Sequence, residues 1–247
     1  MLLAIDIGNT NITYGIFREK NLVKRGKIPT GSKDYLIYLE KFLSQEIEDI
    51  IICSVVPQSL QRLRKDLKKL FSKKPFILGD TISVPIKNLY KNPKEVGQDR
   101  LVNAYAGYYF YRGNLVVIDF GTAVTFDVVS QKGEYRGGMI FPGLRTSLEA
   151  LCAKAALLPK KMRFAIPQGL IGASTRESIL SGIFNGFLAL TREIIQVLQQ
   201  KEGIEKVVFT GGDASKLYPY LSDLGPLKET LTLEGLRLIY ENKRKNK

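Results

Sequence analysis

The sequence contains no histidine, only two cysteines and no long uninterrupted apolar run. Without histidine, imidazole catalysis and imidazole metal ligands are excluded, so proton transfer falls to carboxylates, lysine, tyrosine or water. Cys53 and Cys152 each lie in an apolar stretch, and we expect reduced core residues rather than a disulfide or a metal site. No apolar run reaches membrane-spanning length, and no charged segment precedes the first apolar run. We therefore expect a cytoplasmic protein without membrane contact.

The chain does contain enough apolar residues for a full core, together with an excess of positive charge. Its 247 residues, 45% of them hydrophobic, can form one large domain or two small ones. The formal net charge of +13 could attract nucleic acid or anionic substrates, or it could belong to a solvated lysine-rich surface. Because the cations are scattered and aromatic residues do not alternate with them, we favour the solvated surface over a nucleic-acid partner.

The first ten residues combine a buried strand with an acidic turn. Residues 2–5 are apolar and predict a buried strand that ends at Asp6. A glycine, two asparagines and a threonine follow and predict a sharp turn. The Asp6 carboxylate could hold Mg²⁺ while the turn donates hydrogen bonds to a phosphate, although a plain hairpin would look the same. The residues of this turn are Gly8, Asn9, Thr10 and Asn11.

The same pattern returns in the second half of the chain. A buried strand over residues 115–118 ends at Asp119, and Gly121 and Thr122 follow before an alternating strand. One Asp-x-Gly turn is common, but two at equivalent places in repeated halves are hard to explain by turn chemistry alone. The repeat predicts an α/β protein of two lobes, residues 1–113 and 114–247, with a nucleotide triphosphate and Mg²⁺ in the cleft between them.

A loop before residue 100 gathers groups that suit a small carboxylate substrate. Gly97 predicts a loop, and Asp99 and Arg100 open a helix that runs to about residue 111. Asp99 could simply cap that helix, and Arg100 could form a surface ion pair. Alternatively, the arginine binds a carboxylate and the aspartate accepts a proton from a nearby hydroxyl. The candidate substrate residues are Tyr90, Gly97, Gln98, Asp99 and Arg100.

The last third of the chain adds a glycine turn and a long helix. Gly211 and Gly212 follow a buried strand, where such a turn could approach a nucleotide. The helix begins near Thr175, ends near residue 200 and is apolar on more than one face. It is either fully buried within one chain or packed against a second copy. We hypothesise a homodimer in which Thr175 reaches the neighbouring subunit's site.

The chain carries five motifs in order: Asp6-Ile7-Gly8-Asn9-Thr10, Gly97-Gln98-Asp99-Arg100, Asp119-Phe120-Gly121-Thr122-Ala123, Gly137-Gly138 with Pro142-Gly143, and Thr210-Gly211-Gly212-Asp213. Over nearly the whole chain, this set resembles type III pantothenate kinase, in the acetate and sugar kinase, Hsc70 and actin superfamily. The resemblance implies two duplicated ribonuclease H-like βββαβα lobes and a cytoplasmic homodimer. It also implies transfer of the ATP γ-phosphoryl group to pantothenate, the first step of coenzyme A synthesis.

The resemblance also implies a role for each matching residue. Asp6 would organise Mg²⁺ or another divalent cation, Asp99 would be the general base, and Asp119 would help to bind K⁺ or NH₄⁺. Arg100 and Gly97 would hold the pantothenate carboxylate. The implied ATP and phosphate residues are Asp6, Gly8, Asn9, Thr10, Asn11, Gly121, Thr122, Gly211 and Gly212. The implied substrate residues are Tyr90, Gly97, Gln98, Asp99, Arg100 and Thr175, the last from the neighbouring subunit.

One departure and two alternatives accompany this interpretation. Gln98 stands where a small residue such as alanine is commoner in the family, which is expected to change the packing of the loop. The first alternative is a superfamily kinase with another small acceptor, against which the carboxylate-binding loop argues. The second is a non-catalytic transcription accessory regulator on the same fold. The presence of Asp6, Asp99 and Asp119 together favours chemistry over pure binding.

Overall fold

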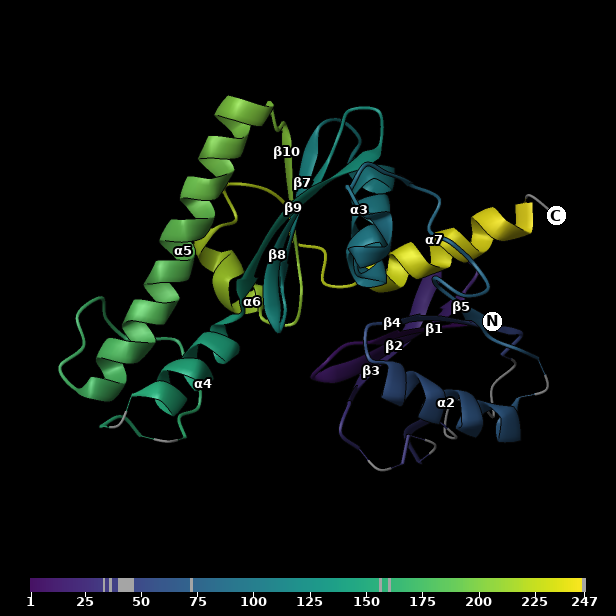
Figure 1. Ribbon diagram of the computed structural model, residues 1–247, viewed down its shortest axis with the longest axis horizontal. Coiled ribbons are helices and arrows are strands. Elements are labelled where there is room, and N and C mark those ends of the chain that lie inside the picture. The colour runs from purple at the N-terminus through teal and green to yellow at the C-terminus, as the bar shows by residue number, and fades with distance from the viewer. Residues whose placement is uncertain are drawn as a thin grey trace. The chain divides into compact units, whose positions relative to one another are not determined.

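The computed structural model describes residues 1–32, 34–35, 37–39, 47–71, 73–155, 157–159 and 161–245. The chain forms two compact units (Figure 1). The first comprises Met1–Tyr109 together with Thr230–Lys247, and the second comprises Phe110–Glu229. Each unit has its own sheet and its own hydrophobic core.

The first unit is built on a sheet in the order β3-β2-β1-β4-β5. The central strand β1 pairs antiparallel with β2 and parallel with β4. It is apolar except at Asp6, because both faces of the sheet are covered. The strands of this sheet are β1 (Leu2–Ile7), β2 (Asn11–Arg18), β3 (Asn21–Pro29), β4 (Asp49–Ser54) and β5 (Phe76–Ile77). The short strand β6 (Lys87–Asn88) is not part of it.

Helices lie on both faces of this first sheet (Figure 1). Leu63 and Leu67 of α2 (Pro57–Leu70) share a core cluster with Ile5 of β1. Side chains alternate along a strand, so Asp6 and the adjacent Cys53 of β4 point to the opposite face. Helix α7 (Leu231–Lys245) packs against β1, β2 and β4. The remaining helices of this part of the chain are η1 (Pro93–Glu95) and α3 (Gln98–Tyr111).

The second unit repeats the first topology. Its strands β7 (Leu115–Phe120), β8 (Ala123–Val129), β9 (Glu134–Pro142) and β10 (Lys206–Thr210) lie in the order β10-β7-β8-β9. Strand β7 pairs antiparallel with β8 and parallel with β10, as β1 does with β2 and β4. The helices are α4 (Leu144–Lys154), α5 (Thr175–Glu202), α6 (Ala214–Leu217) and η2 (Tyr218–Tyr220).

The two central strands are alike down to the burial of single positions. In β1 and in β7 every side chain is buried except the fifth, which is Asp6 in one strand and Asp119 in the other. Each aspartate therefore stands one residue before the end of a strand that is otherwise core. The predicted α/β duplication is confirmed by this topology. The helix that a βββαβα order requires over residues 34–43 falls largely outside the described residues.

The division into units differs from the predicted division at residues 113 and 114 in two respects, the first being that the boundary lies between Tyr109 and Phe110. The final helix α7 belongs to the first unit, whereas the sequence repeat placed it with the second half. The reason is packing, because the buried side chains of Leu233 and Leu236 lie on a helix that covers the first sheet. A repeat along the sequence does not show that the last helix packs back onto the first unit.

Helix α5 is the principal helix of the second core. Phe184, Ile195 and Leu198 pack with the apolar side chains of β7 and β8. Among the described residues, α5 is also the one helix long and apolar enough to cross a membrane by length and composition, which the sequence analysis did not anticipate. Only 28% of that apolar window is buried, and the buried side chains pack one face of α5 against the sheet of this unit. The two cysteines are free and buried, as predicted.

Candidate active site

The turn after β1 presents exposed polar residues at the end of a buried sheet. Asn9, Thr10 and Asn11 are exposed, and Asp6 is partly exposed. The turn is closed by a hydrogen bond of 3.0 Å from the Gly8 amide to the Asn11 carbonyl. The Gly8 amide is thus used within the turn itself. A phosphate at this turn would be met by the exposed residues at its tip.

The Asp6 carboxylate lies beside the buried thiol of Cys53, whose pKa also depends on the charge of Asp99. Asp6 and Cys53 are register partners on adjacent parallel strands, and Cys53 is fully buried. Burial raises the pKa of the Cys53 thiol, and the negative charges of Asp6 and Asp99 and a hydrogen bond with Asp6 raise that pKa further. The first unit therefore holds the predicted metal-organising carboxylate, Asp6, and the predicted base, Asp99, near enough for both charges to raise the pKa of the neutral Cys53 thiol.

Asp99 lies in the first turn of α3, as predicted. Its Oδ1 accepts a hydrogen bond of 2.8 Å from the Arg100 amide. Burial raises the pKa of the Asp99 carboxyl, while the Arg100 amide and charge lower it in part. Burial is the larger of these effects, so the carboxylate is a stronger proton acceptor than an exposed aspartate. This is the environment that a general base requires.

The loop before α3 packs closely around Asp99. A side chain at Gly97 would place its Cβ 2.5 Å from the Asp99 Oδ1, so only glycine fits beneath the carboxylate. Arg100 is 8% exposed, which excludes the alternative of a surface ion pair. Gln98, the departure from the family pattern, lies against Gly79, whose φ is +79°. Its side chain thus packs the loop onto the turn that follows β5.

The second turn resembles the first but is one residue shorter. The Gly121 amide donates to the Ala123 carbonyl at 3.1 Å, Thr122 is exposed, and Asp119 is partly exposed. Gly211, with a φ of +103°, backs directly onto this strand end, where a Cβ would meet Asp119 and lie 2.5 Å from the Phe120 amide nitrogen. The structure therefore gathers Asp119, the second turn and the Gly211 turn in one place.

A charged cluster at this second site was not predicted. Arg145, in the first turn of α4, lies 3.3 Å from the Asp213 carboxylate, which Lys216 also contacts. Asp213 is buried, and its amide donates to the Phe120 carbonyl at 2.9 Å. The sequence signal was Arg145 two residues after Gly143, at the start of a helix.

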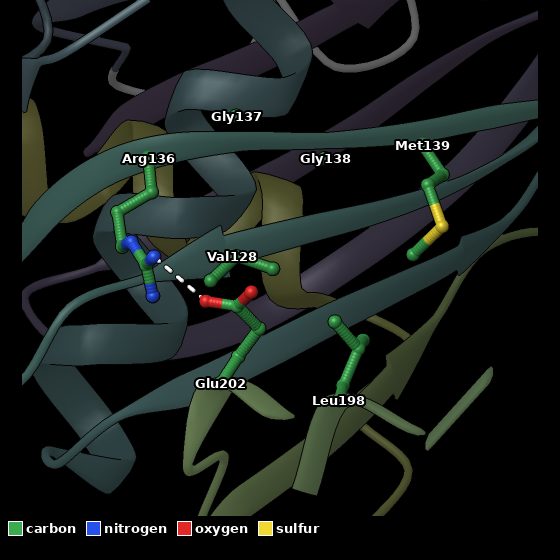
Figure 2. A pocket seen from close by; sticks show the side chains of 7 residues that line it. All are labelled: Val128, Arg136, Gly137, Gly138, Met139, Leu198 and Glu202. Atoms are coloured by element: carbon green, nitrogen blue, oxygen red, sulfur yellow. Dashed lines mark hydrogen bonds and ion pairs between the residues drawn. The ribbon is translucent and has the colours of Figure 1, made fainter. Parts of the chain in front are cut away.

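The paired glycines Gly137 and Gly138 are explained by the sheet. A Cβ at Gly138 would overlap the Phe126 carbonyl of β8, so the close strand approach requires glycine. Figure 2 shows both glycines beside a pocket between β9 and the end of α5, with Arg136 and Glu202 paired there. The pocket has a volume of about 240 Å³, and the Arg136–Glu202 ion pair is 2.8 Å long. Close packing of the strands is therefore sufficient to explain the glycine at position 138.

The donor set suits a divalent cation shared with phosphate. Among the described residues, the structure holds no cluster of three or more acidic or thiol side chains that could form a complete metal cage. Mg²⁺ is characteristically held by one or two carboxylates, with phosphate oxygens and water completing its shell. The single carboxylate at each turn fits that mode of binding.

Comparison with known proteins agrees with this architecture. The family model for type III pantothenate kinase matches residues 2–197. A type III pantothenate kinase from Citrifermentans bemidjiense is 43% identical, covering 98% of this chain and 99% of the relative. A Campylobacter jejuni structure named for the Baf family of transcriptional activators is 22% identical with a TM-score of 0.63, covering 98% and 99% of the two chains. The Clostridium difficile activator of 2-hydroxyisocaproyl-CoA dehydratase, with bound ADPNP, has a TM-score of 0.59 at 13% identity, covering 99% and 96%.

The repeated sheets and their acidic turns define the fold of actin-like ATPases and sugar kinases. Within that class, the full-length match at 43% identity decides the family. The chain belongs to the type III pantothenate kinases, which phosphorylate pantothenate with ATP and a divalent metal in coenzyme A synthesis.

Proposed function

We propose that Asp99 is the general base that takes the proton from the pantothenate hydroxyl as the hydroxyl oxygen attacks the ATP γ-phosphorus in line. Its carboxylate is held at a helix start by the Arg100 amide, and burial raises its pKa toward the working pH. The proton passes to Asp99, and ADP leaves. The single observation that carries this assignment is the burial of the Asp99 carboxylate, which raises its pKa.

The two acidic turns would bind the ATP phosphates. Asp6 would hold the divalent cation, with Gly8, Asn9, Thr10 and Asn11 forming the turn around the phosphates. When bound, Mg²⁺ neutralises charge on the phosphate oxygens during transfer. In the second unit, Thr122 would donate to phosphate, and Asp119 would help to bind a monovalent cation, K⁺ or NH₄⁺. The Gly211-Gly212 turn, which packs on the same strand end, would approach the nucleoside.

The loop before α3 would select pantothenate. Arg100 is a buried guanidinium, and such a group suits a ligand carboxylate in a site that excludes water. Gly97 would add backbone donors, and Tyr90 and Gln98 would line the pocket. With these assignments, Arg100, which would bind the pantothenate carboxylate, directly follows Asp99, which would remove the hydroxyl proton, at the start of α3.

The long helix α5 would form a homodimer interface. Gly182 and Gly186 lie on an exposed face where no atom of the described residues comes within 4 Å of an added Cβ. Half-buried apolar side chains such as Phe187 flank this face, and the segment before α5 exposes Leu170 and Ile171. A second copy would cover these apolar groups, and Thr175 would then contribute to the partner's pantothenate site. A cytoplasmic location agrees with the two free cysteines.

The assignment is tested by ADP formation that depends on pantothenate, with Mg²⁺ and K⁺ present. Asp99→Asn is expected to lower kcat by about 10²- to 10⁴-fold, the usual contribution of a general base. Omitting K⁺ without NH₄⁺ is expected to lower the rate as well. Full activity of Asp99→Asn would overturn the role of base, and activity indifferent to K⁺ would overturn the monovalent site.

A regulator on the same fold is the second candidate. The net charge of +13 is the observation that favours it. The discriminating measurement is DNA retention as a function of salt, where true binding gives a steep slope of log affinity against log salt. Retention that vanishes at physiological salt, beside pantothenate-dependent turnover, would leave only the kinase.

A further inference from the structure

The first phosphate turn is held in place by the residue that follows β3. Thr30 donates from Oγ1 to the Gly8 carbonyl at 2.7 Å and from its amide to the Thr10 carbonyl at 3.0 Å. Thr30 is itself buried, with 8% of its surface exposed. One threonine therefore fixes two carbonyl groups of a turn whose tip is exposed.

Thr30 is fixed in turn by a fully buried tyrosine. The Tyr35 hydroxyl donates to the Thr30 carbonyl at 2.5 Å and lies 3.2 Å from Oγ of Ser59 in α2. Tyr35 has no exposed surface and belongs to the same core cluster as Leu63 of α2. The chain of contacts runs from the core through Tyr35 and Thr30 to the phosphate turn. None of these contacts involves Asp6 or Asp99.

The second unit builds an equivalent brace from different residues. Thr146 donates from Oγ1 to the Thr122 carbonyl at 2.7 Å, and the Gly143 amide donates to the same carbonyl at 2.8 Å. Both residues follow the third strand of their unit, as Thr30 does. A Cβ at Gly143 would lie 2.6 Å from the Thr122 carbonyl oxygen, so glycine is needed for this approach.

We propose that Thr30, Tyr35 and Thr146 are positioning residues that hold the two turns in the conformation that accepts the ATP phosphates. The inference rests on the proposed function of the two turns. Exposed turns would otherwise lose conformational freedom on binding the nucleotide, and a fixed turn avoids that cost. The same contact arises twice, on different residues, at the two places where a phosphate turn needs support. Packing alone requires neither hydroxyl to reach a turn carbonyl.

The test removes the hydroxyl groups without changing side-chain shape. Tyr35→Phe, Thr30→Val and Thr146→Val are each expected to weaken binding of the non-hydrolysable analogue AMPPNP with Mg²⁺, measured by calorimetry, by about threefold to tenfold, the usual effect of one lost hydrogen bond. The KM for ATP should rise similarly, while the KM for pantothenate should change less than twofold. Thr30→Ser retains the hydroxyl and should restore most of the affinity.

The matched control is Tyr240→Phe. Its hydroxyl donates to Asp49 at 2.6 Å, and Asp49 begins β4 at the end of the sheet away from the turn. This variant loses a tyrosine hydroxyl from the same unit, and AMPPNP affinity should be unchanged. Unchanged affinity in Tyr35→Phe and in Thr30→Val, or equal losses for ATP and pantothenate, would overturn the inference. Asp6→Asn separates the two levels: if it leaves AMPPNP binding and turnover intact, the proposed role of the first turn has failed instead.

Discussion

The buried Asp99 carboxylate combines a proposed catalytic role with a cost to folding. Its carboxyl has a raised pKa because burial disfavours the charged form. A group whose pKa is higher in the folded state than in the unfolded state is most favourable at low pH, and that contribution is lost as pH rises through the folded-state pKa. At neutral pH the wild-type protein therefore carries an ionised carboxylate where the fold disfavours one.

Asp99→Asn is consequently expected to unfold at a higher temperature than the wild type near neutral pH. Asparagine keeps an oxygen for the Arg100 amide and has no charge to bury. The difference in Tm should shrink as pH falls toward the ordinary carboxyl range, because the wild-type carboxyl is then protonated too. Thermal unfolding at several pH values measures this. A variant that is less stable at neutral pH would contradict the assignment of burial as the dominant influence.

Gly211 is the residue at which the second site tolerates least change. Its φ of +103° and its contact with the end of β7 both exclude a side chain. Gly211→Ala is expected to reduce the free energy of unfolding by about 1–3 kcal/mol and to weaken nucleotide binding. The control is Gly31→Ala, where no described part of the chain lies within 4 Å of an added Cβ, so stability should change by less than about 0.5 kcal/mol. Equal effects of the two changes in denaturant titrations would count against the packing argument.

At the scale of elements, the central strands and their turns could be predicted from the sequence. The contacts that hold those turns in place could not. Strands β1 and β7 are continuous apolar runs ending in Asp-x-Gly, so pattern alone locates Asp6 and Asp119. The braces at Thr30 and Thr146 join residues from different elements, and no local pattern records such a contact. The same holds for Cys53, which reads as a core residue until strand pairing places it beside Asp6.

Helix α5 carries the prediction about assembly. Gly186→Glu would place a charge on the face that we assign to the partner subunit, so the dimer is expected to dissociate. Sedimentation equilibrium should report a dimer for the wild type and a monomer for this variant. Gln200→Glu makes the same change in charge at an exposed position near the end of α5 and should remain dimeric. A wild type that is monomeric at all concentrations would end the proposal.

At the scale of the whole molecule, duplication explains both the fold and the site. Each unit places one aspartate at the same strand position, yet only the first adds the proposed base, at the start of α3. The path of α7 could not be predicted, because the chain returns to the first unit only through non-local packing. The fold class followed from periodicity and from the resemblance, whereas the environment of each carboxylate needed the structure.

The central claim is that the Asp99 carboxylate accepts the substrate proton. Its most direct test is the pH dependence of kcat/KM for pantothenate, in wild type and in Asp99→Asn. Because burial raises the pKa of Asp99, wild-type activity should fall as pH drops through a value above the ordinary aspartate range. In Asp99→Asn that acid limb should disappear, leaving a low rate that does not vary over the same interval. An acid limb retained at the same pH in Asp99→Asn, with activity near that of the wild type, would contradict the claim.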